Sequence, residues 1–157
     1  MKKFLFDCGT RDATASLGLL ALRVMIGLMM LIGHGLPKLQ GYAARKDLFY
    51  VPDFFPLKFM SPQVSLAAAI TAEFGASLLI IIGLATRPAA FLLGFGMVVA
   101  AFGFHGTSPW FVSPPTTYDA KELALLYLIP MVAIILAGGG SFSLDAVIHK
   151  EGKRRRW

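Results

Sequence analysis

Four long apolar segments constrain the fold of this chain more than any other feature. They run roughly over residues 15–36, 64–84, 88–106 and 120–137. Each is close to the about 20 residues that a helix needs to cross the hydrocarbon core of a bilayer. Backbone polar groups in lipid must be satisfied within their own segment, so each segment is expected to be a helix. The sequence therefore predicts an all-α integral membrane protein, a four-transmembrane-helix up-and-down bundle.

The composition leaves no room for a separate soluble domain. Hydrophobic residues make up 56% of the 157 residues and charged residues 15%, against about 45–50% and about 25% in soluble domains. We expect a cytoplasmic segment over residues 1–14, one transmembrane domain over residues 15–148 and a basic tail over residues 149–157. The single cysteine, Cys8, excludes an internal disulfide and a C-x-x-C redox centre.

The distribution of lysine and arginine predicts the orientation. Four spans put both termini on one side of the membrane, and more of the positive charge is expected on that side. It would hold Lys2, Lys3, Arg11, Arg87, Lys150, Lys153, Arg154, Arg155 and Arg156, and the other side Lys38, Arg45, Lys46, Lys58 and Lys121. The positive-inside rule then places both termini in the cytoplasm of a bacterium, with the chain in the inner membrane. The same rule explains the net charge of +6 without nucleic-acid binding.

Helix signals set the expected ends of the spans. Ser61 and Pro62 are typical of a helix start. Pro37 is expected to end the first span, because proline disfavours the helical conformation of the residue before it. The run of three glycines from Gly138 is expected to stop the fourth span, which Pro130 should kink.

Two charged residues fall inside the spans. Arg23 lies near the middle of the first span and Glu73 at the middle of the second. Charges at membrane depth face the bundle and find partners, because insertion of each costs about 2.5–3.5 kcal/mol. Their depths agree within about one turn, so the sequence predicts a buried Arg23–Glu73 ion pair. Such a pair either fixes only the register of the helices or takes part in function.

A second polar layer is expected at the outer ends of the spans. It contains His34, Lys38, His105, Asp119 and Glu122. One interpretation is a set of ordinary interfacial residues, and the other is a polar pocket open to the outside. In a pocket, histidine can carry protons near neutral pH.

Haem and metal centres fit the sequence poorly. Bis-histidine ligation of haem by His34 and His105 would need both residues to face inward. Zinc or iron bound by His34, His105 and Glu122 has suitable ligand types, but no spacing motif supports such a site.

In the basic tail, Lys153, Arg154, Arg155 and Arg156 favour anionic lipid headgroups, or serve only to fix the topology.

The order and spacing of several motifs resemble the DoxX family of small bacterial membrane proteins. The motifs are Leu22-Arg23, His34-Gly35-Leu36-Pro37-Lys38-Leu39, Glu73-Phe74-Gly75, Ile82-Gly83-Leu84-Ala85-Thr86-Arg87, His105, Glu122 and Gly139-Gly140-Ser141-Phe142-Ser143-Leu144-Asp145. The resemblance covers roughly residues 17–148. It implies a four-helix membrane bundle and an association with redox systems. One branch is a subunit of thiosulfate:quinone oxidoreductase, and another is a membrane partner of superoxide dismutase and a sulfurtransferase in oxidative-stress complexes.

Three functions remain open at this point. The first is a redox-linked membrane subunit, either catalytic or accessory, that binds a quinone or small molecule between Arg23, Glu73, His34 and His105. The second is a non-enzymatic anchor or scaffold for a soluble partner that uses the basic tail. The third is a small-solute transporter, which would need an oligomer because four spans are few for one chain.

Overall fold

The computed structural model describes residues 9–10, 12–113 and 120–148, and the regular elements in these ranges are helices. Three long helices each contain a π-helical turn, which lies inside the first two and ends the third, and a fourth helix follows them. They are α2 (Ala13–Met30), η1 (Leu31–Gly35) and α3 (Leu36–Gln40); α5 (Pro62–Ile70), η3 (Thr71–Gly75) and α6 (Ala76–Ile82); α7 (Thr86–Val99) and η4 (Ala100–Phe104); and α8 (Lys121–Ala137). The connection between the first two long helices contains α4 (Tyr42–Arg45) and a 3-10 turn, η2 (Leu57–Phe59).

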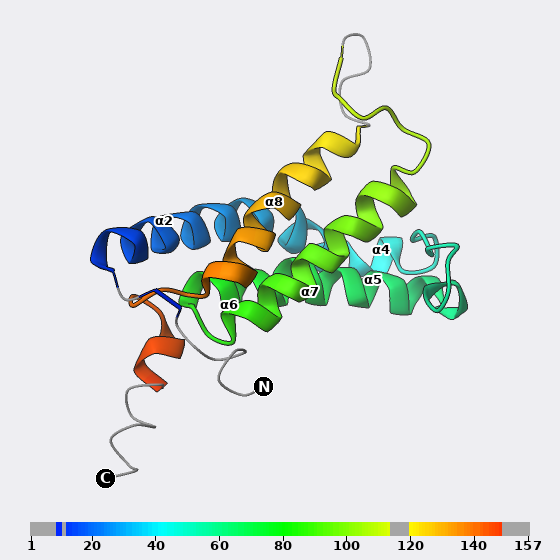
Figure 1. The fold of residues 1–157 in the computed structure, drawn as a ribbon. Helices are drawn as coiled ribbons and strands as arrows, with labels where there is room; N and C mark the ends of the chain where they lie inside the picture. The colour runs from blue at the N-terminus through cyan, green and yellow to red at the C-terminus, as the bar shows by residue number, and fades with distance from the viewer. Residues whose placement is uncertain (1–8, 11, 114–119, 149–157) are drawn as a thin grey trace.

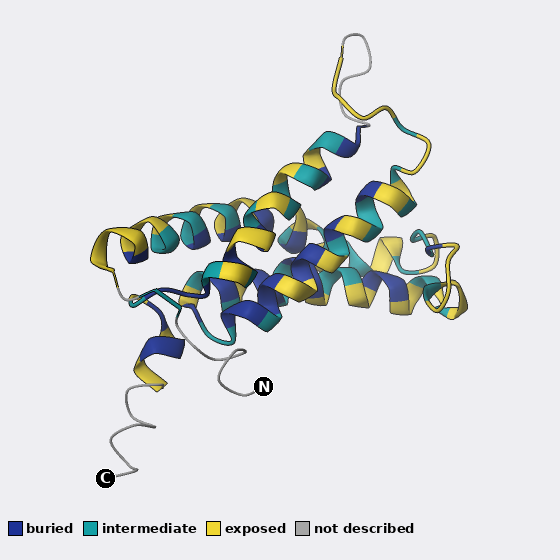
Figure 2. Cartoon of the chain, in the orientation of Figure 1, coloured by how far each residue is buried: buried dark blue, intermediate teal, exposed yellow. Residues whose placement is uncertain are grey.

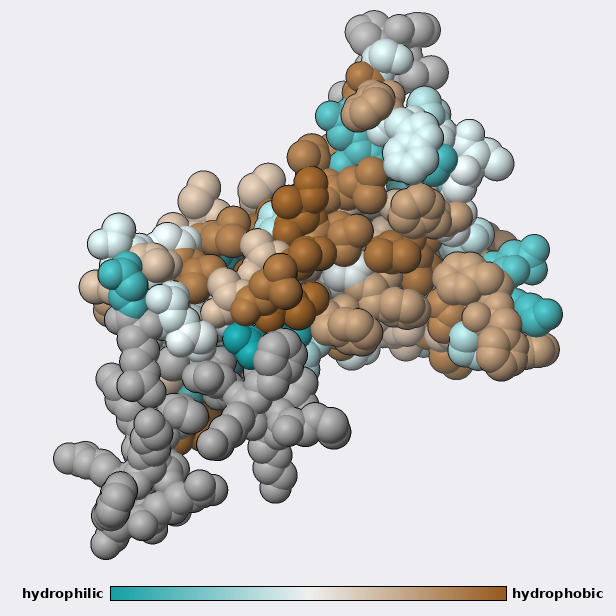
Figure 3. Space-filling model, in the orientation of Figure 1, coloured by the Kyte–Doolittle hydropathy of each residue, from teal (hydrophilic) through white to brown (hydrophobic). Residues whose placement is uncertain are grey.

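Three helices among the described residues are long and apolar enough to cross a membrane: Ala13–Gln40, Pro62–Ile82 and Thr86–Phe104. The fold is therefore that of an all-α membrane protein, as predicted. The predicted fourth span corresponds to α8, which has 17 residues. Apolar side chains cover the middle of the molecule, and hydrophilic ones gather toward its ends (Figure 3).

The helices form two hairpins that cross each other. The first joins α2 to α5 and α6, and the second joins α7 to α8 (Figure 1). The hairpins are in contact through α6 with α7 and through α2 with α8. The buried core lies along this contact and includes Met30, Ile80, Leu93, Met131 and Ile134, while the outward faces of the helices are exposed (Figure 2). Toward the opposite end the helices of the two hairpins diverge (Figure 1), and the cavity described below lies in the region between them, which is called the wedge here.

The helix ends agree with the sequence signals except at Pro37. Ser61 caps α5 by accepting a hydrogen bond from the Val64 N–H, and α8 ends at Gly138. The first long helix does not end at Pro37 but continues to Gln40. The reason is local: after η1, Pro37 occupies the first turn of α3, where its missing N–H is tolerated.

A closing segment, residues 138–148, returns to the end of the bundle where the described chain begins and fastens it; this end is called the inner end for its place in the bundle and not for a side of the membrane. Asp145 accepts hydrogen bonds from the N–H groups of Ala85 and Thr86 and from the Thr86 hydroxyl, at 2.7–2.9 Å. These are otherwise orphan donors at the start of α7, so the carboxylate acts as a helix cap. The Ser141 N–H donates to the hydroxyl of Ser16 near the start of α2. Both ends of the described chain therefore meet at one end of the bundle.

Candidate functional site: a cavity between the hairpins

Three π-helical turns lie around the wedge, one in each long helix. In each turn an N–H bonds to the carbonyl five residues earlier: Leu36 to Leu31, Ala76 to Thr71 and His105 to Ala100. A π-helical turn widens the helix and frees backbone groups, and such turns are frequent at functional sites. η1 packs directly against η3. The turns therefore mark the level at which the two hairpins separate.

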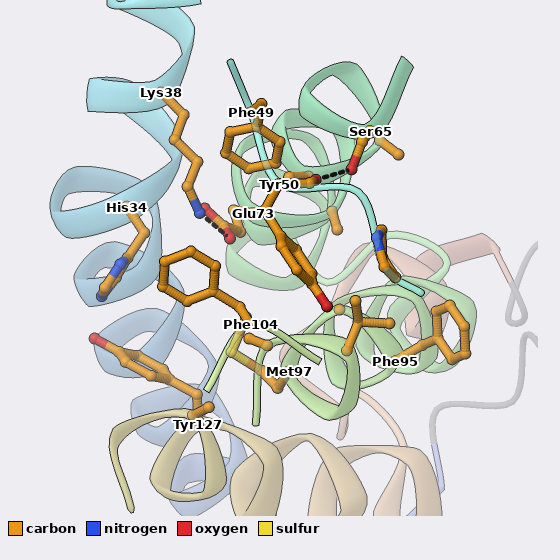
Figure 4. A pocket seen from close by; sticks show the side chains of 18 of the residues that line it. His34, Lys38, Phe49, Tyr50, Ser65, Glu73, Phe95, Met97, Phe104 and Tyr127 are labelled. Carbon is orange, nitrogen blue, oxygen red and sulfur yellow. Dashed lines mark hydrogen bonds and ion pairs between the residues drawn. The ribbon is translucent and has the colours of Figure 1, made fainter. Parts of the chain in front are cut away.

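The turns η1 and η3 bring together an ion pair. Lys38, one turn beyond η1, forms a salt bridge with Glu73 in η3, as Figure 4 shows. The side chain of Glu73 is 9% exposed and that of Lys38 is 23% exposed. The Oε1 atom of Glu73 accepts from Lys38, whereas its Oε2 atom is buried and has no partner among the described residues. A buried carboxylate oxygen without a partner is costly, and this oxygen belongs to a residue that lines the cavity described below.

His34 faces Tyr127 across the mouth of the wedge. Their rings meet edge to face, with 5.5 Å between centroids, so η1 contacts the second hairpin through this pair (Figure 4). His34 is exposed and Tyr127 half-buried. The imidazole of His34 and the phenol of Tyr127 thus place two polar groups side by side, each on a helix whose neighbouring residues are mostly apolar.

A cavity of about 460 Å³ occupies the wedge. One corner is polar, with His34, Lys38 and Glu73, and Tyr127 beside it (Figure 4). Most of the remaining lining is apolar or aromatic: Met30, Phe49, Pro52, Leu57, Met60, Ala68, Ala69, Ala72, Leu92, Phe95, Gly96, Met97, Val99, Ala100, Phe104, Leu123 and Ala124. Its volume and its few convergent polar groups match a site for a small organic molecule.

The structure gathers part of the predicted outer polar layer. His34, Lys38 and His105 all line the cavity. Glu122 does not line it; its Oε2 atom accepts a hydrogen bond from the Val112 N–H in the loop before α8. Asp119 and the tail residues Lys153, Arg154, Arg155 and Arg156 lie outside the described residues. The metal-ligand set His34, His105 and Glu122 is therefore not assembled here, and no group of three His, Cys, Asp or Glu side chains in the described ranges is placed to hold a metal.

The predicted Arg23–Glu73 ion pair is wrong. Arg23 is fully buried at the inner end, where its guanidinium donates to the carbonyls of Ile80 at 3.0 Å and Phe142 at 2.7 Å. Ile80 lies seven residues beyond Glu73, which is about 10 Å along a helix. The guanidinium is therefore held by carbonyls at the end of α6 and by the closing segment, while its Nε atom is buried and has no hydrogen-bond partner among the described residues. The prediction assumed a carboxylate partner for Arg23, whereas its acceptors are backbone carbonyls.

Comparison with known proteins assigns the chain to a family. The DoxX family model matches residues 18–106, which is more than half of the chain. The protein belongs to the DoxX family. It is 27% identical over 154 residues to an uncharacterized protein of Haemophilus influenzae, covering 96% of each chain. A second uncharacterized protein of that organism is 34% identical over 90 residues, or 57% of this chain and 65% of the relative. No solved structure matches.

The motifs shared with DoxX proteins acquire physical roles in this structure. The motif from His34 to Lys38 provides two polar residues of the cavity and Gly35, which lies against the backbone of Glu73 and Phe74. The closing motif ends in Asp145, the cap of α7. In this DoxX protein one set of motifs therefore builds the cavity and another fastens the inner end.

Sequence reasoning did not assign a site role to Tyr50, Ser65 or Tyr127. All three line the cavity. The sequence does contain an indication for Tyr127, because a tyrosine in the middle of an apolar segment carries a hydroxyl that needs a polar partner. Tyr50 lies in the long loop between the first two helices, and nothing in the local sequence indicates that its ring enters the bundle.

Proposed function

We propose that this DoxX protein is the membrane subunit of a redox system and binds a quinone, or a lipid-soluble molecule of similar size, in the cavity between its hairpins. The observation that carries the proposal is the cavity of about 460 Å³, which joins apolar walls to one polar corner at Lys38 and Glu73. Pockets for small organic ligands have this volume and this distribution of polar groups.

The lining residues fit a quinone head group. The rings of Phe95 and Phe104 supply flat apolar surface on which a planar ring can pack. Lys38 has N–H donors beyond the one that it gives to Glu73, and a quinone oxygen accepts such bonds. A bound quinone would supply reversible uptake of two electrons and two protons. His34, exposed beside the cavity, is suited to exchange protons with the surroundings near neutral pH.

The cavity opens toward lipid as well as toward the polar corner. Leu92 and Phe95 line it and are 40% and 44% exposed on the outer surface of α7. In a bilayer these side chains contact acyl chains. A ligand with an apolar tail can therefore enter from the membrane and keep its tail among lipids, which favours a lipid-soluble molecule over a water-soluble one.

We also propose that α8 is a fourth span, with both termini in the cytoplasm of a bacterium. A stripe of apolar residues on α8 faces outward: Leu126, Ile129, Val132 and Leu136 are all exposed. Their spacing of three to four residues makes one helix face suited to lipid. Both ends of the described chain lie at one end of the bundle, which is consistent with an even number of spans. The larger number of lysines and arginines on the terminal side then sets the orientation.

The electron donor would be a partner protein. The chain has one cysteine, so it has no dithiol of its own to pass electrons to a quinone. In this proposal the DoxX subunit holds the quinone at the membrane, and a soluble or membrane-bound redox protein docks against it.

Ligand binding tests the proposed function. The purified protein, in nanodiscs, is titrated with a short-tailed 1,4-benzoquinone, and binding is followed by quenching of intrinsic fluorescence and by native mass spectrometry. We expect one bound quinone per chain. Ala69→Phe places a ring in the cavity and should abolish binding, whereas Ala67→Phe on the same helix, outside the lining, should not. Absence of binding to the unmodified protein contradicts the proposal.

A further inference from the structure

We infer that Tyr50 is a second polar anchor of the cavity, and that the ligand is a flat ring with oxygen atoms at two separated positions, one at Lys38–Glu73 and one at the Tyr50 hydroxyl. This inference rests on the proposed function and extends it. It assigns to the Tyr50 hydroxyl the role of distinguishing a ring with two oxygen atoms from a ring with one.

A buried hydrogen bond fixes the place where Tyr50 enters the cavity. The Ser65 hydroxyl donates to the Tyr50 carbonyl at 2.6 Å, and Ser65 is 7% exposed in α5. Tyr50 belongs to the long loop between the first two helices, so this bond fastens the loop to the bundle. The position of the phenol is therefore set by a helix rather than by the loop alone.

Two further contacts orient the Tyr50 ring. It packs edge to face on Phe104 of η4, with 5.5 Å between centroids. Its hydroxyl lies next to Gly103, where a Cβ atom would be 3.1 Å from the hydroxyl oxygen. Glycine at position 103 thus leaves room for the hydroxyl. The ring extends from the loop into the cavity in Figure 4.

The Tyr50 hydroxyl is available to a ligand. Within the part of the chain that the structure describes, it makes no hydrogen bond, since the only bond at this residue uses the backbone carbonyl. A phenol can both donate and accept, and a tyrosine hydroxyl that faces a mostly apolar cavity favours a hydrogen-bond partner there. A ligand oxygen would supply that partner.

The two anchors come from different parts of the molecule and differ in strength. Lys38 and Glu73 form a charged pair on the first hairpin, whereas Tyr50 offers a neutral hydroxyl from the loop. Charge-assisted hydrogen bonds are roughly twice as strong as neutral ones. A ligand with a single oxygen therefore binds at the charged pair, and only a ligand with a second oxygen uses Tyr50 as well.

The test compares two probes on a variant that removes only the hydroxyl. The probes are a decyl-substituted 1,4-benzoquinone and a decyl-substituted phenol, which has one oxygen. In Tyr50→Phe we expect quinone affinity to fall about three- to tenfold, the effect of one neutral hydrogen bond, and phenol affinity to stay unchanged. Tyr42→Phe, in α4 and outside the cavity lining, is the matched control and should bind both probes as the unmodified protein does.

A second variant keeps the inference testable if Tyr50→Phe does not fold. Gly103→Ala retains the phenol but places a Cβ atom against its hydroxyl, and it should weaken binding of the quinone more than that of the phenol. Equal quinone affinity in the unmodified protein and in a folded Tyr50→Phe variant overturns the role of Tyr50 while the proposed function stands. Absence of quinone binding to the unmodified protein overturns the proposed function instead.

Discussion

Gly35 packs directly against the backbone of Glu73. A Cβ atom at position 35 would lie 2.8 Å from the Glu73 carbonyl oxygen and 2.8 Å from the Phe74 nitrogen. These neighbours are backbone atoms of η3 and cannot move aside as a flexible side chain can. The first and second long helices therefore approach each other closely beside the ion pair, and any side chain at position 35 would separate them there.

Substitution of Gly35 should destabilise the protein, while substitution of its neighbour Gly33 should not. We expect Gly35→Ala to lower the free energy of unfolding by about 1–3 kcal/mol, the usual cost of an added methyl group in a packed interior. Gly33 lies in the same π-helical turn but has nothing within 4 Å of a Cβ position, so Gly33→Ala should change stability by less than about 1 kcal/mol. Thermal unfolding in a mild detergent measures both. Equal effects would contradict the close approach.

The Lys38–Glu73 pair should show strong coupling. Lys38→Met leaves the Glu73 carboxylate buried without its cation, which should cost about 1–3 kcal/mol. In the double variant Lys38→Met, Glu73→Leu, no charge remains buried, so stability should recover in part. A double-mutant cycle of unfolding free energies gives the coupling. Lys58→Met, at an exposed position, is the control for loss of a lysine, and additive effects of the two substitutions would rule out the pair.

Arg23 should matter for stability and not for the ligand. Arg23→Met removes the hydrogen bonds from a charged group to the carbonyls of Ile80, Ile81 and Phe142, and we expect the free energy of unfolding to fall by about 3 kcal/mol or more. Protease cleavage within the closing segment should also become faster, because Phe142 loses its contact with the guanidinium. Arg45→Met, at an exposed position, should have neither effect. Quinone affinity of the folded Arg23→Met protein should equal that of the unmodified protein, and a large decrease would place Arg23 in the binding site.

The proposed orientation can be checked by labelling single cysteines. In a Cys8→Ser background, a cysteine at Asp53 in the long loop should react with a membrane-impermeant maleimide in intact spheroplasts. A cysteine at Lys153 should react only after the membrane is permeabilised. The reverse pattern would show that the termini are external, and reaction of both in intact spheroplasts would show that the number of spans is odd.

The sequence predicted the helices well and the polar contacts only in part. Long apolar runs determine helices in a membrane regardless of tertiary detail, so the helices, the start at Ser61 and the stop at Gly138 follow from local rules. The pairing of Arg23 does not, because its acceptors are backbone carbonyls that become available only when the closing segment folds back. The predicted depth of Lys38 and His34 was enough to place both residues at the same end of the bundle, where they line the cavity. It could not show that Glu73 pairs with Lys38, since a regular helix of 100° per residue does not include the π-helical turns.

The π-helical turns also affect how the cavity can change. Each turn holds one residue more than an α-helical turn, so conversion of η1 to regular α-helix would rotate everything beyond it by about 100°. Lys38 lies beyond η1 and would swing away from Glu73, whereas Arg23 lies before it and would keep its carbonyl partners. A shift of one residue in the first helix would thus open the ion pair and leave the inner end of the bundle unchanged.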